Sequence, residues 1–234
     1  MTSPSKSIVC LSGGLDSCVA TAMAIEAELE PVMAISFFYN QKHSREIEAA
    51  QEIARYYKLR HSVIYLDSIT DPIKGASALL RGSDLQLAQD RSPSASTGRI
   101  PTSYVPGRNT IMLAIAQSIA EANNLDHIIT GFQATDYNGY PDTREIYIQA
   151  WNSLAHYATK RGYYNNPISV IAPLVNMSKA SVVHHGLRLH APLHLTTSCY
   201  VGGETACGRC DSCNIRRAAF RENGQEDPIT YAEV

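Results

Sequence analysis

The stretch SGGLDS at residues 12–17 has the composition of a loop that binds an anion. Its adjacent glycines let the backbone turn sharply and bring N–H groups close to a ligand. A helix that begins at Leu15 adds unpaired N–H groups and a partial positive charge. The hydroxyls of Ser12 and Ser17 add donors, so the stretch favours phosphate. Asp16 fits there if it caps the helix or holds Mg²⁺ against the phosphates.

The spacing of this loop matches neither a Walker loop nor G-x-G-x-x-G. Ser-Gly-Gly-x-Asp-Ser after a first strand resembles the pyrophosphate loop of the ATP pyrophosphatases. That family cleaves ATP between the α- and β-phosphates and forms acyl or amide adenylates. The bland alternative is a strand-to-helix turn with a helix cap. The ATP-binding residues that we expect are Cys10, Leu11, Ser12, Gly13, Gly14, Leu15, Asp16, Ser17 and Cys18.

Four of the six cysteines lie close together near the C-terminus, at Cys199, Cys207, Cys210 and Cys213. In a reducing compartment such a cluster indicates a metal site rather than disulfides. Four thiolates suit a closed, tetrahedral and therefore structural Zn²⁺. An iron–sulfur cluster uses similar spacing, and a disulfide pair or free thiols are the remaining alternatives.

Short apolar runs at 7–11, 32–37, 62–66 and 127–130 predict buried parallel strands. Helical patterns at 15–29, 44–57 and 108–122 lie between them. The expected buried face of the third helix is formed by Ile111, Ala114, Ile115, Ser118 and Ile119. Alternating strands and helices predict an α/β fold, with a doubly wound, mostly parallel sheet covered on both faces.

The stretch from Thr70 to Tyr104 interrupts this rhythm with polar residues, proline and glycine. A long irregular segment in a compact domain is often a lid or an insertion. We therefore predict an α/β ATP-pyrophosphatase domain at 1–191 and a small zinc-binding element at 192–234 packed on it.

The composition excludes several classes of function. With 44% hydrophobic residues the chain can bury a core, and its net charge of −2 implies no broad basic face for nucleic acid. No apolar run approaches the roughly 20 residues that span a bilayer. The first residues, MTSPSKS, have no apolar signal core, which predicts a cytoplasmic protein without a membrane partner.

Several distinctive stretches follow the loop in a fixed order. They are FFYNQKHSREIEAA at 37–50, YVPGRNTIMLAIA at 104–116, TGFQATDYNGYPDTREIYI at 130–148 and CGRCDSC at 207–213. In this order, from about Ile8 to Phe220, the chain resembles the 7-cyano-7-deazaguanine synthase family. The resemblance implies an adenine nucleotide α-hydrolase-like fold, one structural zinc and a homodimer. It also implies the use of 7-carboxy-7-deazaguanine, ATP and ammonia to make the cyano product, a queuosine precursor.

Four residues are candidates for the chemistry, which asks for alignment and charge stabilisation more than for covalent catalysis. Asp16 and Ser17 would hold pyrophosphate with Mg²⁺ nearby. Lys179, at an expected helix start, would add a cation, or would be a solvated lysine. Arg108 opens a helix and would pair with the substrate carboxylate or a phosphate, or would form a buried ion pair.

The irregular segment TDYNGYPDTR at 135–144 is the expected wall of the base pocket. A guanine-like edge needs a carboxylate acceptor for its N–H donors, and aromatic side chains stack on the ring. The expected substrate residues are Asp136, Tyr137, Tyr140, Asp142 and Arg144.

One position departs from the family's pattern, because Thr143 stands where the family usually has cysteine. This leaves a ligase that stops at the amide, or uses another amine, as an alternative. A tRNA-thiolating enzyme would need a reactive cysteine at the adenylate and a basic surface, which the net charge disfavours. A zinc-knuckle RNA-binding module is favoured slightly by the basic run IRRAAFR at 215–221 but does not need the loop.

Overall fold

A five-stranded parallel sheet forms the centre of the computed structural model, which describes residues 5–40, 45–86, 100–133, 139–203 and 205–232. The strand order is β3-β2-β1-β4-β5, and each neighbouring pair is parallel. The strands are β1 (Ser7–Cys10), β2 (Pro31–Phe38), β3 (Arg60–Tyr65), β4 (His127–Ile129) and β5 (Ser169–Ile171).

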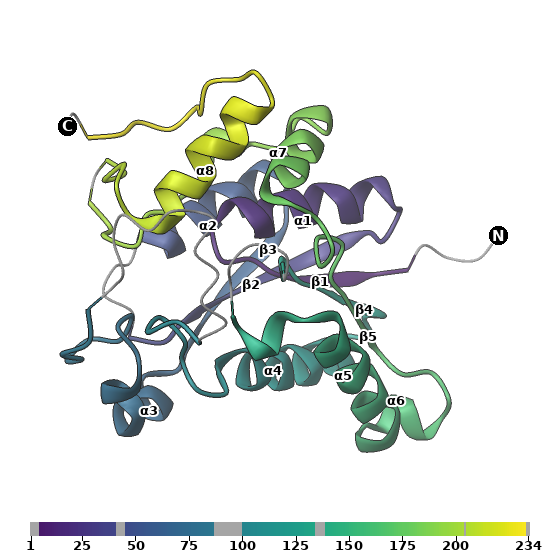
Figure 1. The fold of residues 1–234 in the computed structure, drawn as a ribbon. Coiled ribbons are helices and arrows are strands. Elements are labelled where there is room, and N and C mark those ends of the chain that lie inside the picture. The colour runs from purple at the N-terminus through teal and green to yellow at the C-terminus, as the bar shows by residue number, and fades with distance from the viewer. Residues whose placement is uncertain (1–4, 41–44, 87–99, 134–138, 204, 233–234) are drawn as a thin grey trace.

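Helices cover both faces of the sheet (Figure 1). One face carries α1 (Leu15–Glu26), α2 (Arg45–Tyr56), α7 (Lys179–Arg188) and α8 (Asp211–Glu222). The other carries α4 (Arg108–Ala122), α5 (Glu145–Ala158) and α6 (Lys160–Tyr163). The short helix α3 (Asp67–Thr70) and the 3₁₀ turns η1 (Asp71–Ala76), η2 (Pro141–Thr143) and η3 (Leu193–Leu195) complete the described elements. The predicted doubly wound α/β fold is confirmed.

The two apolar layers follow from the alternation of side chains along the strands. Val9 and Ile129 point into the layer beneath α1, α7 and α8, and Ile8 and Ile128 point into the layer beneath α4 and α5. Phe220 of α8 is fully buried in the first layer, so the C-terminal helix shares the core of the sheet.

Strand β1 lies at the point where the chain reverses its direction of winding. Its neighbours are β2 on one side and β4 on the other, and the two connections that leave them cover opposite faces. In open α/β sheets the crevice at such a switch point, beyond the carboxyl ends of the strands, is where ligands bind. The loop that follows Cys10 lies in that crevice.

The structure differs from the sequence analysis in three places. The short edge strand β5 was not among the four predicted strands. The segment predicted as irregular contains η1 at 71–76, whereas 87–99 lie outside the described residues. The predicted face of α4 was wrong, because its buried residues are Asn109, Leu113, Ala116, Gln117 and Ala120. Alanines face the sheet there, since small side chains let a helix approach closely, and the isoleucines flank them partly buried.

No helix among the described residues is both long and apolar enough to cross a membrane.

Candidate active site and cysteine cluster

A cavity of about 330 Å³ lies at the carboxyl ends of β1, β2 and β4. The loop after β1 contributes Ser12, Gly14, Asp16 and Ser17 to its wall. The opposite wall includes Tyr39, Arg108, Tyr140 and Thr143, which come from three separate segments. We call residues 12–17 with Gly131 and Thr197 the loop side, and Tyr39, Arg108, Tyr140 and Thr143 the facing side.

Hydrogen bonds of the Ser12 and Ser17 hydroxyls fix the backbone of the loop. The Ser17 Oγ accepts from the Ser12 N–H at 3.2 Å and donates to the Gly14 carbonyl at 3.0 Å. Ser12 Oγ lies 3.1 Å from Ser17 Oγ and accepts from the Gly14 N–H at 3.3 Å. Gly14 is the N-cap of α1, and no side chain among the described residues caps this helix. Its first N–H groups therefore face the cavity with the positive end of the helix dipole.

Gly13 is required by both conformation and space. Its φ of +82° belongs to the left-handed region, and a Cβ there would lie 2.1 Å from the Glu46 carbonyl oxygen. The loop thus packs directly on the first turn of α2.

Asp16 is paired with Lys179 across the start of two helices. The Lys179 Nζ donates to both carboxylate oxygens of Asp16, at 2.8 and 2.9 Å. Lys179 begins α7, whose N-cap Ser178 accepts from the Ser181 N–H. Asp16 therefore does not cap α1. Asp16 lines the cavity, whereas Lys179 stands behind it and holds the carboxylate in place.

Arg108 occupies the centre of the facing side. It is the first residue of α4 and follows Gly107, whose φ is +65°. The Arg108 Nη1 donates to the Tyr39 hydroxyl at 3.4 Å, and the guanidinium carbon lies 5.5 Å from the centre of the Tyr39 ring. Burial raises the pKa of Tyr39, so the phenol stays neutral beside the cation.

The segment 139–144 supplies some of the predicted substrate residues to this wall. The Tyr140 hydroxyl bonds to the Ser103 hydroxyl at 2.6 Å, and Thr143 Oγ1 donates to the Tyr140 carbonyl at 3.2 Å. Both residues line the cavity. Tyr140 and Arg108, far apart in sequence, therefore meet in the same wall.

Two other predicted substrate residues, Asp142 and Arg144, lie outside the cavity wall. Asp142 is buried outside the cavity wall, and its Oδ2 accepts from the Asn109 N–H at 3.4 Å, which fixes the start of α4. Arg144 is exposed and donates to the Pro141 carbonyl at 3.2 Å. Asp136 and Tyr137 lie outside the described residues. Of the predicted ATP residues, Gly13, Leu15 and Cys18 support the loop from behind and do not line the cavity.

Several residues that build the site were missed from the sequence, Tyr39 among them. A Cβ at Gly131, just after β4, would lie 2.7 Å from the Ser17 nitrogen, so only glycine lets β4 approach the loop. The Thr197 N–H donates to the Gly13 carbonyl at 2.9 Å. Glu46 lines the cavity from the first turn of α2. A glycine directly after a strand was the one available signal, for Gly131.

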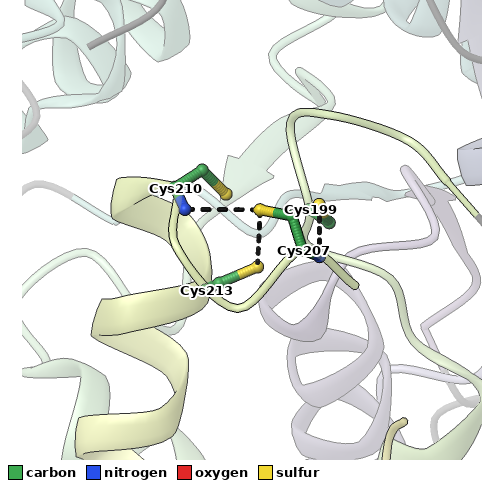
Figure 2. Close-up of side chains that lie close together, drawn as sticks. All are labelled: Cys199, Cys207, Cys210 and Cys213. Atoms are coloured by element: carbon green, nitrogen blue, oxygen red, sulfur yellow. Dashed lines mark hydrogen bonds between the residues drawn. The ribbon is translucent and has the colours of Figure 1, made fainter. Parts of the chain in front are cut away.

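The four cysteines converge at the start of α8 (Figure 2). The sulfur atoms of Cys199, Cys207, Cys210 and Cys213 all lie within 4.8 Å of one another. The Cys207 sulfur accepts from the Cys210 N–H at 3.3 Å, and the Cys199 sulfur accepts from the Cys207 N–H at 3.3 Å. These contacts favour thiolates. The cluster can therefore hold a metal ion.

The cluster is joined to the cavity through the segment that precedes it. Cys199 and Tyr200 line the cavity, and Thr197 binds Gly13. Buried Arg216 of α8 donates to Asp227 at 2.8 and 2.9 Å and to the Thr196 hydroxyl at 2.6 Å. The α8 helix thus fixes the segment that supports the loop.

The chain is similar to known proteins over nearly its whole length. The family model described as queuosine biosynthesis protein QueC matches residues 6–224. A 7-cyano-7-deazaguanine synthase of Oceanobacillus iheyensis is 43% identical over 228 residues, covering 97% of this chain and 98% of the relative. The enzyme of that name from Prochlorococcus marinus is 45% identical over 226 residues, covering 96% of each chain.

Among solved structures, a 4-thiouridine synthetase in complex with RNA and bound ATP has the same fold. It superposes with a TM-score of 0.52 at 17% identity, over 82% of this chain and 42% of the synthetase. The likeness agrees with the doubly wound α/β fold.

Proposed function

Because the chain belongs to the family of the queuosine biosynthesis protein QueC, we propose that it is a ligase that makes 7-cyano-7-deazaguanine. Its substrates would be 7-carboxy-7-deazaguanine, ATP and ammonia. The observation that carries this proposal is the single cavity into which a phosphate-binding type of loop, the Arg108 guanidinium and Tyr140 all open. Such a cavity brings a nucleotide and a small acid together.

The reaction runs through two activations. The carboxylate oxygen attacks the α-phosphate of ATP, pyrophosphate leaves, and ammonia displaces AMP from the acyl carbon to give the amide and a proton. The amide oxygen then attacks the α-phosphate of a second ATP, pyrophosphate leaves again, and loss of AMP and of both nitrogen-bound protons gives the nitrile. The protein must align the oxygen with the α-phosphate and stabilise the charge that develops there.

Each side of the cavity has a part in this chemistry. The open N–H groups of α1 and the Ser12 and Ser17 hydroxyls would bind the pyrophosphate end of ATP. Arg108 would pair with the substrate carboxylate, since a guanidinium binds a carboxylate through two hydrogen bonds. The Asp16 carboxylate, held by Lys179, would be the ligand for Mg²⁺ at the phosphates. Mg²⁺ would neutralise charge on the leaving pyrophosphate.

The four cysteines would hold a structural Zn²⁺. Tetrahedral zinc with bonds of about 2.3 Å to sulfur places the sulfurs about 3.8 Å apart. The Cys207 and Cys213 sulfurs lie 4.0 Å apart already, and all four lie within 4.8 Å. Four thiolates leave no open position for water, so the ion would stabilise the segment beside the cavity. Metal analysis of the purified protein should find one zinc per chain, and iron with a visible absorption band would contradict this.

The cysteines at the cavity disfavour a thiolating activity. Burial raises the pKa of the Cys10 thiol to about 12, so at neutral pH it is protonated and unreactive. Cys199, which also lines the cavity, is one of the four clustered cysteines and would be bound to the metal. An amidating and dehydrating enzyme needs no thiolate.

Product analysis tests the proposal directly. The enzyme would be given ATP and ammonium with the carboxylate in one reaction and with the amide in another. We expect the nitrile from both, with two AMP released per nitrile from the acid and one from the amide. If the acid gave only the amide with one AMP, and the amide were inert, the protein would be an amide-forming ligase. A cytoplasmic homodimer stays a prediction, which light scattering and cell fractionation would test.

A further inference from the structure

The Glu46 carboxylate has no part in the chemistry described so far, although it opens into the active-site cavity. The charged residues in the described wall are Asp16, Arg45, Glu46 and Arg108. Asp16 belongs to the phosphate loop and is paired with Lys179. Exposed Arg45 donates to the Gly203 carbonyl. Of the described charged residues in the wall, the Glu46 carboxylate and the Arg108 guanidinium therefore remain available to a substrate.

Glu46 is placed firmly, and its carboxylate opens into the cavity. Its backbone carbonyl packs on Gly13, which fixes the residue at the edge of the loop side. Across the described part of the chain, no hydrogen bond or ion pair joins the Glu46 carboxylate to another side chain. Burial raises the pKa of Glu46, and the nearby Arg108 guanidinium lowers it. A half-buried acceptor without a side-chain partner can accept from a ligand that donates and takes the place of water.

The chemistry of the proposed substrate matches this pair of charges. One end of 7-carboxy-7-deazaguanine is a carboxylate, and the pyrimidinone edge carries a ring N–H and an exocyclic amino group. A carboxylate can accept from both of these donors at once. A cavity that contains one guanidinium and one unpaired carboxylate therefore complements a molecule with an anion at one end and two donors at the other.

We infer that the Glu46 carboxylate accepts the ring N–H and the 2-amino group of the deazaguanine and so selects the substrate. This inference rests on the proposed function. Asp142 is a poorer candidate, because its carboxylate lies outside the cavity wall and accepts from the Asn109 N–H at 3.4 Å. Tyr39 and Tyr200 line the same cavity, and burial and the negative charge of Glu46 raise the pKa of both phenols. The Glu46 carboxylate therefore lies near aromatic rings that can contact a flat base.

The test compares two substrates and two variants. The substrates are 7-carboxy-7-deazaguanine and its analogue without the 2-amino group. We expect the wild-type enzyme to have a kcat/KM roughly tenfold to hundredfold lower for the analogue, as for the loss of a hydrogen bond to a charged group. Glu46→Gln should lower kcat/KM for the natural substrate by a similar factor and leave that for the analogue within about threefold. The KM for ATP should not change.

The control is Glu48→Gln, an exposed carboxylate in the same turn of α2, which should preserve both values. Should Glu46→Gln fail to fold, Glu46→Asp keeps the charge and shortens the side chain by one methylene, and it should raise KM with little change in kcat. Thermal unfolding of each variant separates misfolding from lost recognition.

Three results would overturn the inference. The first is that Glu46→Gln discriminates between the two substrates as well as the wild-type enzyme does. The second is that Glu46→Gln raises the KM for ammonium instead, as expected for a residue that handles ammonia. In the third, Asp136→Asn would abolish the discrimination while Glu46→Gln kept it. A wild-type enzyme that turned over neither substrate would instead overturn the proposed function, and with it the basis of the inference.

Discussion

The two sides of the cavity are built by different means. The loop side is formed largely by backbone groups and small side chains within the six residues 12–17, supported by Gly131 and Thr197. The facing side is formed by the large side chains of Tyr39, Arg108 and Tyr140, each from a separate segment. Backbone N–H groups suit phosphates, which every nucleotide carries, whereas large side chains can fit one particular substrate. We therefore expect changes on the loop side to affect every activation step and changes on the facing side to affect the deazaguanine selectively.

The largest effect should come from Asp16→Ala. This change removes the expected Mg²⁺ ligand and leaves the Lys179 ammonium without its partner at 2.8 Å. We expect AMP formation to fall by about 1000-fold or more, as for the loss of a group that stabilises the transition state. Rapid-quench measurement of AMP checks this, with thermal unfolding to show that the fold persists. Near wild-type turnover would exclude Asp16 from both metal and phosphate binding.

Arg108→Gln should have the next largest effect and a selective one. The change leaves the substrate carboxylate without a cation in a buried wall, which costs about 2–4 kcal/mol. The KM for the deazaguanine should therefore rise by about 100-fold, and that for ATP far less. Arg144→Gln is the matched control, because Arg144 is exposed and lies outside the cavity wall. Equal increases in both KM values would place Arg108 at the phosphates. They would contradict the expectation that the facing side acts on the deazaguanine selectively.

Gly131→Ala tests the close approach of the segment after β4 to the backbone of the loop side. The added Cβ would lie 2.7 Å from the Ser17 nitrogen and 2.9 Å from the Asp16 carbonyl carbon, and both are backbone atoms that cannot rotate away. We expect a destabilisation of about 1–3 kcal/mol and a roughly tenfold higher KM for ATP. Gly75→Ala meets nothing within 4 Å and should change stability by less than about 0.5 kcal/mol. Unfolding in urea and ATP kinetics measure both variants, and a similar outcome for the two would refute the steric argument.

Thr143→Cys should have the smallest effect. Thr143 Oγ1 donates one bond, at 3.2 Å, to the Tyr140 carbonyl, and a thiol of similar size occupies the same space as a weaker donor. We expect kcat for nitrile formation to change by less than about threefold. The product ratio of amide to nitrile is the measurement. A switch in the final product would show that this position alone separates a synthase from an amide-forming ligase.

The difference between the two sides also explains what the sequence could predict. The loop follows a strand and opens a helix, so local signals located Ser12, Asp16 and Ser17 in the cavity wall. The facing side depends on the strand order, which places the end of β2 and the start of α4 at one crevice. No local pattern at Tyr39 or Glu46 reports that neighbourhood.

The remaining errors have the same physical origin. Strand β5 has three residues at the sheet edge, too few for a periodic pattern. In α4 both isoleucines and small residues repeat at helical spacing, and only contact with the sheet decides that Leu113, Ala116 and Ala120 are buried. Asp142 stays a predicted substrate residue, but no local pattern indicates that it accepts from the Asn109 N–H in the first turn of α4.

The bond from the Thr197 N–H to the Gly13 carbonyl has a consequence for how the molecule is made. A ribosome releases the glycine loop first, but the residues that close it, from Thr196 and Thr197 to Arg216 and Phe220, emerge about 180 to 200 residues later. At roughly 5–20 residues per second, the nascent chain spends on the order of ten seconds or more with this loop incomplete. The proposed nucleotide site would thus be complete only once the segment from Thr196 to Phe220 has been synthesised.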